Sequence, residues 1–285
     1  MTPFFRKLHG LGNDYLVAEA LEDFTLNPWW IQEICHRHTG LGSDGILEPF
    51  DSKTADYGLR IHNPDGTEAE KSGNGLRIFA YWLVSQKQAP PTFTVETKGG
   101  IVTCEVEENI VTVEMGRASA EPQDVPIEST SPFVDCELPG LGGLRATAIG
   151  IGNPHCVLFF EEDLETLPWR QWGPLIESHS LFPNRTNVQF ARVVADNQIE
   201  IRIWERGAGE TSASGSSASA VCAAAVGKGL CKPGRIVASM PGGELIVWVN
   251  EHGEIKIRGP VEEIGAMHLS KQWLQERTSP NETVL

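Results

Sequence analysis

Most features that would place this sequence in a familiar functional class are missing from it. No apolar run approaches the roughly 18 residues that a membrane-spanning helix needs, and the opening MTPFFRKLHG lacks the apolar core of a signal peptide. The six cysteines form no CxxC pair. Because they lie far apart in a chain without an export signal, we expect buried thiols rather than disulfides, and a cytoplasmic protein.

Positive charge is in short supply. Lys and Arg number 23 against 38 Asp and Glu, which gives a net charge of −15. A protein with a net charge of this sign is not attracted to nucleic acid or to anionic membranes. We therefore expect no nucleic acid and no membrane partner, and a small molecule as the ligand. The same charge is compatible with a homodimer. The composition, 40% hydrophobic and 21% charged, is that of a folded globular protein.

Signatures of several catalytic classes are absent as well. There is no Walker loop and no GxSxG elbow. Residues 40–45 fit GxGxxG, but they follow a predicted helix and precede a strand, the reverse of a dinucleotide site. We interpret them as a helix end and a turn. His36 and His38 lack a third ligand at metal spacing, so a surface or capping role is favoured and we predict no metal site.

Glycine, by contrast, is abundant and clustered, with 29 of 285 residues. At about 150 residues per domain the length predicts two domains. The two halves show the same order: strands, a loop rich in Glu and Gly, one apolar helix, then strands. The loops are 68–75 and 210–217, and each places Ser-Gly directly before its helix. This order indicates an internal duplication of about 140 residues.

The expected elements divide between the two halves. Residues 1–117 form the first domain, with 263–285 packing back on it, and residues 118–262 form the second. A linker with irregular edges is predicted at 117–143, where Pro, Ser and Glu are frequent. Helices are predicted at 28–38, 76–84, 164–178 and 218–228.

The two loops have a chemical meaning. A Gly-rich loop that opens a helix presents free backbone N–H groups at the positive end of the helix dipole, which attracts anions. For one loop alone, plain N-capping by Ser is the simpler interpretation. Two matching loops, each opening the most apolar helix of its half, favour a functional role. From facing domains they could grip one small anionic ligand.

Two further motifs are open to more than one interpretation. Glu205 could hold a ligand ammonium and Arg206 offers a fork for a carboxylate, although a surface ion pair is the alternative. His155 follows Asn153-Pro154 and is either a turn histidine or a ligand contact.

At these loops the sequence resembles the diaminopimelate epimerase family, over nearly the whole chain. The resemblance implies an α+β fold of two similar domains, each a mostly antiparallel sheet wrapped around a central helix, with a ligand cleft between them. It also implies no cofactor, neither pyridoxal phosphate nor metal, and a role in amino-acid biosynthesis, of lysine in particular. The matching stretches are KLHGLGNDY (7–15), RHTGLGSDG (37–45), NPDGTEAE (63–70), GNGLR (73–77), GNPHCV (152–157), NV (187–188), ERGAGET (205–211) and MPGGEL (240–245).

The resemblance also implies which residues contact the substrate. His155 is expected beside the reacting carbon. The expected substrate contacts are Asn13, Asn63, Asn153, Asn187, Glu205 and Arg206. The expected carboxylate-binding backbone at the helix starts is Gly73, Asn74, Gly215 and Ser216.

The sequence departs from the family at the chemistry. The family has a cysteine directly before Gly in each loop, and these positions are Ser72 and Ser214 here. In the family, one thiolate removes the α-proton while the opposite thiol delivers a proton to the other face, as inversion requires. A serine hydroxyl is far less acidic than a thiol and needs an adjacent base. The ionisable residues close in sequence or motif are Glu70, Lys71, His155 and Glu210.

Three explanations fit the two serines. The chain is a natural relative with altered chemistry, an epimerase from which both thiols were removed, or a relative that lost catalysis and kept binding. The serine-rich run at 212–219 favours the first. We therefore expect a cofactor-independent isomerase acting at the α-carbon of diaminopimelate or a related small amino acid, with Ser72 and Ser214 as catalytic residues. The alternatives are a small-zwitterion-binding protein without turnover and a one-base isomerase or lyase.

Overall fold

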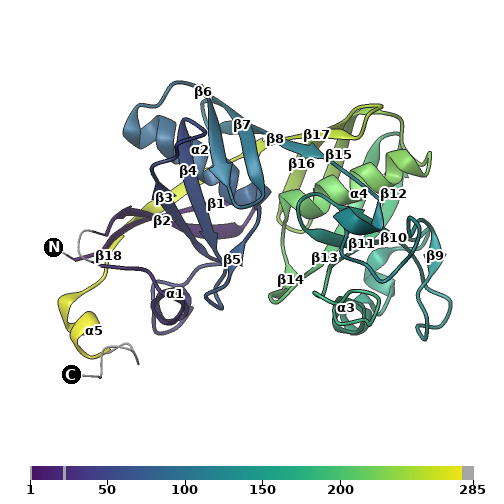
Figure 1. Ribbon diagram of the computed structural model, residues 1–285, viewed down its shortest axis with the longest axis horizontal. Helices are drawn as coiled ribbons and strands as arrows, with labels where there is room; N and C mark the ends of the chain where they lie inside the picture. Colours follow the sequence, from purple (N-terminus) through teal and green to yellow (C-terminus); the bar gives the residue numbers. More distant parts are fainter. Residues whose placement is uncertain (1, 22–23, 278–285) are drawn as a thin grey trace.

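In the computed structural model, which describes residues 2–21 and 24–277, the chain folds into two lobes that lie side by side (Figure 1). The first lobe contains β1 (Phe4–Gly10), β2 (Asn13–Ala20), α1 (Pro28–Cys35), β3 (Ile46–Phe50), β4 (Tyr57–His62), β5 (Glu68–Ala69), α2 (Gly73–Lys87), β6 (Thr92–Thr97), β7 (Gly100–Glu107) and β8 (Ile110–Arg117). The second contains β9 (Cys136–Glu137), β10 (Arg145–Gly150), β11 (Pro154–Phe159), α3 (Trp169–Glu177), β12 (Asn187–Ala195), β13 (Gln198–Glu205), β14 (Gly209–Thr211), α4 (Gly215–Gly227), β15 (Gly234–Met240), β16 (Gly243–Val249) and β17 (Glu254–Pro260).

Strand pairing follows the same scheme in both lobes. In the first lobe, β1–β2, β3–β4, β4–β5, β6–β7 and β7–β8 are antiparallel, while β2–β3 and β4–β6 are parallel. The second lobe repeats this scheme from β10 to β17. Each parallel pair is joined through a helix, as parallel strands require. The predicted duplication and the mostly antiparallel sheets are therefore confirmed.

The last strands of the two repeats join the lobes. β8 pairs antiparallel with β17 over seven residue pairs, from Glu254–Arg117 to Pro260–Ile110. The chain then returns to the first lobe, where β18 (Glu262–His268) pairs with β1 and is followed by α5 (Lys271–Gln275). Residues 278–285 of the predicted C-terminal segment lie outside the described residues. Among those residues, no helix has the length and apolarity to cross a bilayer.

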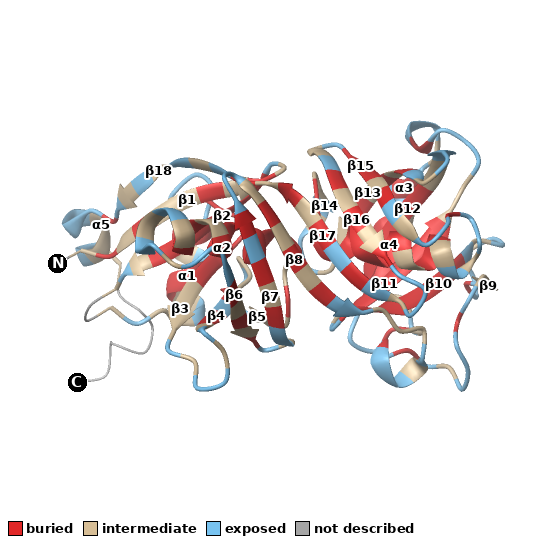
Figure 2. Ribbon diagram, turned by 90° about the horizontal axis from the view of Figure 1, so that it is seen from above, coloured by how far each residue is buried: buried red, intermediate tan, exposed pale blue. Residues whose placement is uncertain are grey.

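Each sheet wraps around its central helix. The inner faces of α2 and α4 belong to one continuous apolar core that extends through both lobes (Figure 2). In α2 the buried side chains are large, for example Phe79 and Leu83, whereas α4 is filled with Ala and Ser. Ile257 of β17 lies under the start of both helices.

Three sequence expectations need correction. The helix expected at 28–38 ends at Cys35, because the amides of Leu41 and Gly42 close its last turn onto the carbonyl of Ile34. The helix expected at 164–178 is split into a 3-10 turn (Leu164–Thr166) and α3 by Pro168, which has no amide to donate.

The linker expected at 117–143 is only partly irregular. It contains a 3-10 turn (Pro122–Asp124) and β9, and it buries Val125, Phe133 and Leu138 in the core of the second lobe. Its Pro and Ser content reflects turns, while its scattered apolar residues supply packing. By contrast, all six cysteines are free and five of them are buried, as expected. His36 also takes the predicted capping role, because its Nδ1 accepts from the amides of His38 and Thr39.

The starts of α2 and α4 touch each other. A Cβ built on Gly73 would lie 3.0 Å from the Cα of Gly215, and a Cβ on Gly215 would lie 3.0 Å from the Cα of Gly73. Any side chain at either position would also meet Ile257 at under 3.0 Å. The two glycines are therefore required for the lobes to come together.

Gly73→Ala should destabilise the protein by about 1–3 kcal/mol, because its methyl group would push the two helix starts apart. Gly227→Ala at the end of α4 is the matched control, since a Cβ there meets nothing within 4 Å. Denaturant unfolding measures both. Equal unfolding midpoints for the two variants would contradict the close contact.

Candidate active site

A cavity of about 1080 Å³ opens between the two lobes. Its wall includes the first residues of both Ser-Gly loops and the ends of strands from each lobe. Seven of the expected substrate contacts and one expected catalytic serine line it: Asn13, Asn63, Ser72, Asn153, Asn187, Glu205, Arg206 and Ser216. The cleft predicted between two domains is therefore present, and most of the expected residues face it together.

Ser72 and Ser214 occupy equivalent places as the N-caps of α2 and α4. The Oγ of Ser72 accepts from the amide of Gly75 at 3.1 Å, and the Oγ of Ser214 accepts from the amide of Ser217 at 3.4 Å. The first two amides of each helix donate to no acceptor among the described residues. They belong to Gly73 and Asn74 in α2 and to Gly215 and Ser216 in α4. Since the two helix starts touch, these four N–H groups and the two positive dipole ends lie close to one another.

The side chain of Asn74 ties the two loops together. Its Nδ2 donates to the Oδ1 of Asn13 and to the carbonyl of Ala213, each at 3.0 Å. Its Oδ1 accepts from Arg77 at 2.5 Å. Because Ala213 precedes Ser214, this network fixes one serine loop against the other. Asn13 also donates to Asp44 at 2.8 Å, so its oxygen and one amide hydrogen are already used within the protein.

The remaining expected asparagines also have protein partners. Asn63 donates to Thr67 at 3.0 Å within its turn. Asn187 donates to the carbonyl of Pro154 at 2.9 Å and accepts from the amide of Arg206 at 3.0 Å. Asn187 thus positions the backbone that carries both Arg206 and its neighbour Glu205.

His155 is fully buried and is absent from the cavity wall. Its Nε2 lies 2.8 Å from the Oδ1 of Asn153, and its Nδ1 lies 3.0 Å from Gln189. Burial, with a smaller contribution from the charge of Arg206, lowers the pKa of His155 to about 3, so the ring is neutral. Its observed contact is with Asn153, which does reach the cavity.

None of the four ionisable residues considered from the sequence makes a hydrogen bond to either serine. Glu70 pairs with Arg206 at 3.2 Å, and Glu210 pairs with Arg170 at 2.8 Å. Lys71 turns its ammonium toward the carbonyl of Met115, 3.1 Å away. This follows from the extended backbone at Ser72, which sends consecutive side chains to opposite sides.

The residues that do meet the serines were not singled out from the sequence as their partners. The hydroxyl of Tyr15 lies 3.2 Å from the Oγ of Ser72, and the Oγ of Ser216 lies 3.3 Å from that of Ser214. Tyr15 is two residues after Asn13 on β2, so both side chains share one face of the strand. The alternation of side chains along this strand was the sequence signal that could have placed Tyr15 beside the expected site residue Asn13.

Glu205 is one of several acidic residues in the cavity wall. It is partly buried in the cavity wall, and burial raises the pKa of Glu205 to about 7. The charge of Asp44 contributes a smaller part of this rise, and a hydrogen bond from Ser214 opposes it. A carboxyl group with a pKa near neutrality can accept or release a proton at physiological pH.

Two buried cations lie near the start of α2 without a carboxylate within ion-pairing distance among the described residues. Lys71 lines the cavity, and burial lowers its pKa. Arg77 is fully buried, and burial lowers its pKa to about 10. Both add positive potential to that of the two helix ends, which favours an anion at the start of α2.

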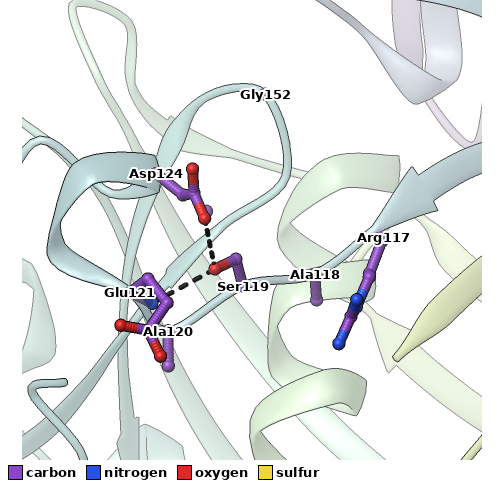
Figure 3. Close-up of a pocket in the computed structure, with 8 residues that line it drawn as sticks. Arg117, Ala118, Ser119, Ala120, Glu121, Asp124 and Gly152 are labelled. Carbon is purple, nitrogen blue, oxygen red and sulfur yellow. Dashed lines mark hydrogen bonds between the residues drawn. The ribbon is translucent and has the colours of Figure 1, made fainter. Parts of the chain in front are cut away.

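A second hollow of about 560 Å³ is lined by residues 117–121, Asp124, Gly150 and Gly152 (Figure 3). Ser119 there donates to Asp124 at 2.6 Å, and Arg117 extends away from both, as Figure 3 shows. None of the expected site residues lines it.

The sequence pattern of the family described as diaminopimelate epimerase matches residues 5–121 and 147–263, more than half of the chain. The chain belongs to the diaminopimelate epimerase family. It is 45% identical over 276 residues to diaminopimelate epimerase 2 of a Nostoc species, covering 94% of this chain and 96% of that one. It is 39% identical over 274 residues to the diaminopimelate epimerase of Pelotomaculum thermopropionicum, covering 91% and 96%.

Solved structures share the fold at lower identity. A hydroxyproline epimerase of Agrobacterium vitis with bound trans-4-hydroxy-L-proline matches with a TM-score of 0.71 and 15% identity, covering 95% of this chain and 93% of the other. A probable proline racemase of Agrobacterium radiobacter with bound carbonate matches with a TM-score of 0.70 and 16% identity, with the same coverage. The expected family and fold are confirmed, and the relatives' names agree with the expected isomerase class.

Replacing Glu205 should change how stability depends on pH. The unfolded carboxyl ionises near 4.5 and the folded one near 7, so the folded state holds a proton that the unfolded state releases between these values. Folded-state stability is therefore lost as pH rises from about 4.5 to 7, and Glu205→Gln removes this loss. We expect the variant to gain about 2 kcal/mol on the wild type between pH 5 and pH 8.

Thermal or denaturant unfolding across this pH range measures the difference. Glu251→Gln, in an exposed turn, is the matched control and should follow the wild type. A constant difference between Glu205→Gln and the wild type at all pH values would show that Glu205 is ionised throughout.

Proposed function

We propose that this protein is a cofactor-independent epimerase that moves a proton at the α-carbon of diaminopimelate or a closely related small amino acid. The convergence of two helix starts on one place in the cleft carries the proposal. It offers a site for an α-carboxylate between two sets of backbone amides, with a serine on either side. The names of the relatives support the substrate class.

The geometry supports different roles for the groups on the two faces of the α-carbon. An α-carboxylate held between the amides of Gly73, Asn74, Gly215 and Ser216 places the α-carbon between the hydroxyls of Ser72 and Ser214. One serine then removes a proton from one face while the other returns a proton to the opposite face. The amides, with the cations of Lys71 and Arg77 nearby, stabilise the negative charge that spreads into the carboxylate as the proton leaves.

Glu205 and Arg206 are suited to the rest of an amino-acid substrate. The carboxyl of Glu205 can pair with the α-ammonium, which would draw its proton off and leave it ionised. Arg206 reaches into the cavity beside Asn153 and Asn187, where a second polar end of the substrate fits. We further infer a cytoplasmic protein, because free thiols at all six cysteines suit a reducing compartment.

Incubation with stereochemically pure diaminopimelate in D2O tests the proposal. We expect inversion at one α-carbon with deuterium incorporated there. Ser72→Ala and Ser214→Ala should each lower the rate of inversion by at least 100-fold, because two groups on opposite faces are needed. A matched control is Ser85→Ala, which removes a hydroxyl that, within the described part of the chain, donates only to the carbonyl of Trp82. Saturable binding without exchange in the unmodified protein would overturn the epimerase in favour of a binding protein.

The double variant Ser72→Cys with Ser214→Cys separates the geometry of the cleft from the chemistry of its serines. Thiols are far more acidic than hydroxyls, so the rate of inversion should rise by at least tenfold if the cleft is arranged for epimerisation. No gain in the double variant, together with strongly unequal effects of the two single Ala substitutions, would point to a one-base isomerase or lyase.

A further inference from the structure

The hydrogen bonds that the Ser72 oxygen accepts determine the direction in which its own O–H bond points. The amide of Gly75 donates to its Oγ at 3.1 Å, and an amide N–H can only donate. The hydroxyl of Tyr15, 3.2 Å away, has Ser72 as its sole hydrogen-bond partner among the described residues. If Tyr15 donates, both lone pairs of the serine oxygen are occupied. The remaining O–H bond then points away from both donors, toward the cavity that Ser72 lines.

The surroundings of Tyr15 hold the phenol in the donor role. The side chain is 7% exposed, and its ring lies against Gly45, where a Cβ would come within 2.7 Å of the ring. Burial raises the pKa of Tyr15 above its ordinary value. The negative charges of Glu205 and Asp44 raise it further, while the hydrogen bond to Ser72 opposes the rise. The phenol therefore keeps its proton across the physiological pH range.

Ser214 has the opposite arrangement. The amide of Ser217 donates to its Oγ, and the Oγ of Ser216 lies 3.3 Å away. A hydrogen bond in which the Ser214 hydroxyl donates its own proton lowers the pKa of the Glu205 carboxyl. Loss of that proton to Glu205 leaves an oxygen held by Ser216 and Ser217 beneath the cavity wall, which Ser216 lines. The two serines are equivalent in the fold but opposite in their hydrogen bonding.

Building on the proposed function, we propose that Tyr15 is the proton donor behind Ser72, so that Ser72 delivers a proton to the α-carbon while Ser214 removes one. In this direction the α-proton moves to Ser214 as the proton of Ser214 moves to Glu205. The proton of Ser72 then moves to the opposite face of the α-carbon as the proton of Tyr15 moves to Ser72. Glu205 ends with one proton more and Tyr15 with one fewer, and the reverse reaction or exchange with solvent restores both.

Tyr15→Phe tests this inference, because it removes one oxygen and keeps the ring that packs on Gly45. Inversion and exchange in place are measured in D2O, starting separately from each stereoisomer. The isomer whose α-proton faces Ser214 should still exchange its proton without inversion, at a rate within about threefold of the wild type. Inversion should fall by at least 30-fold in both directions, with little change in KM. Tyr57→Phe is the matched control, since Tyr57 packs edge-on against Phe93 in the same lobe.

The outcomes are distinguishable. Equal losses of inversion and of exchange from both isomers would show a merely structural role for Tyr15 and overturn the inference, as would unchanged inversion. Absence of any exchange or inversion in the wild type would instead contradict the proposed function, and with it the inference.

A second measurement places Tyr15 behind Ser72 rather than elsewhere in the cleft. A thiol at position 72 carries a more acidic proton of its own. The fold-loss in the rate of inversion caused by Tyr15→Phe should therefore be at least tenfold smaller in a Ser72→Cys background than in the wild type. The same loss in both backgrounds would contradict a proton passed through Ser72.

Discussion

The arrangement of this protein depends on one close contact, in which two helices meet start to start across the lobe interface. Each helix start carries about half a positive charge and several unpaired N–H groups, so bringing two of them together is unfavourable until an anion lies between them. Gly73 and Gly215 permit the approach because neither has a side chain. The amide of Asn74 holds it by donating to the loop of the other lobe. A site that attracts a carboxylate thus follows from the way the lobes pack.

The duplication gives two similar serine loops, and their neighbours make them different. The phenol of Tyr15 lies next to Ser72, and two buried cations, Lys71 and Arg77, lie near the start of α2 with Lys71 turned away from the serine. Around Ser214 are two more serines and the carboxyl of Glu205. An inversion at carbon needs a proton taken on one side and given on the other, so asymmetry between otherwise equivalent halves is a chemical advantage. Hydroxyls need this help more than thiols would, because they ionise with much greater difficulty.

Much of this could be predicted from the sequence, because it depended on pattern. The repeated order of strands and helices, the N-cap role of each Ser-Gly pair and the cleft residues from both halves all follow from local signals or from the family resemblance. What could not be predicted depended on side-chain direction. Lys71 adjoins Ser72 in the chain but points to Met115, while Tyr15, 57 positions away, meets its hydroxyl. His155 is in the expected motif but lies behind Asn153, and the linker hides core residues among its turns.

The central claim is that both helix starts bind the same anion. Titration of the 15N-labelled protein with diaminopimelate, followed by amide chemical shifts, tests it most directly. The backbone amides of Gly73, Asn74, Gly215 and Ser216 should all shift, and all four should saturate with a single dissociation constant. Shifts confined to one helix, or two different dissociation constants for the two pairs, would contradict a shared site.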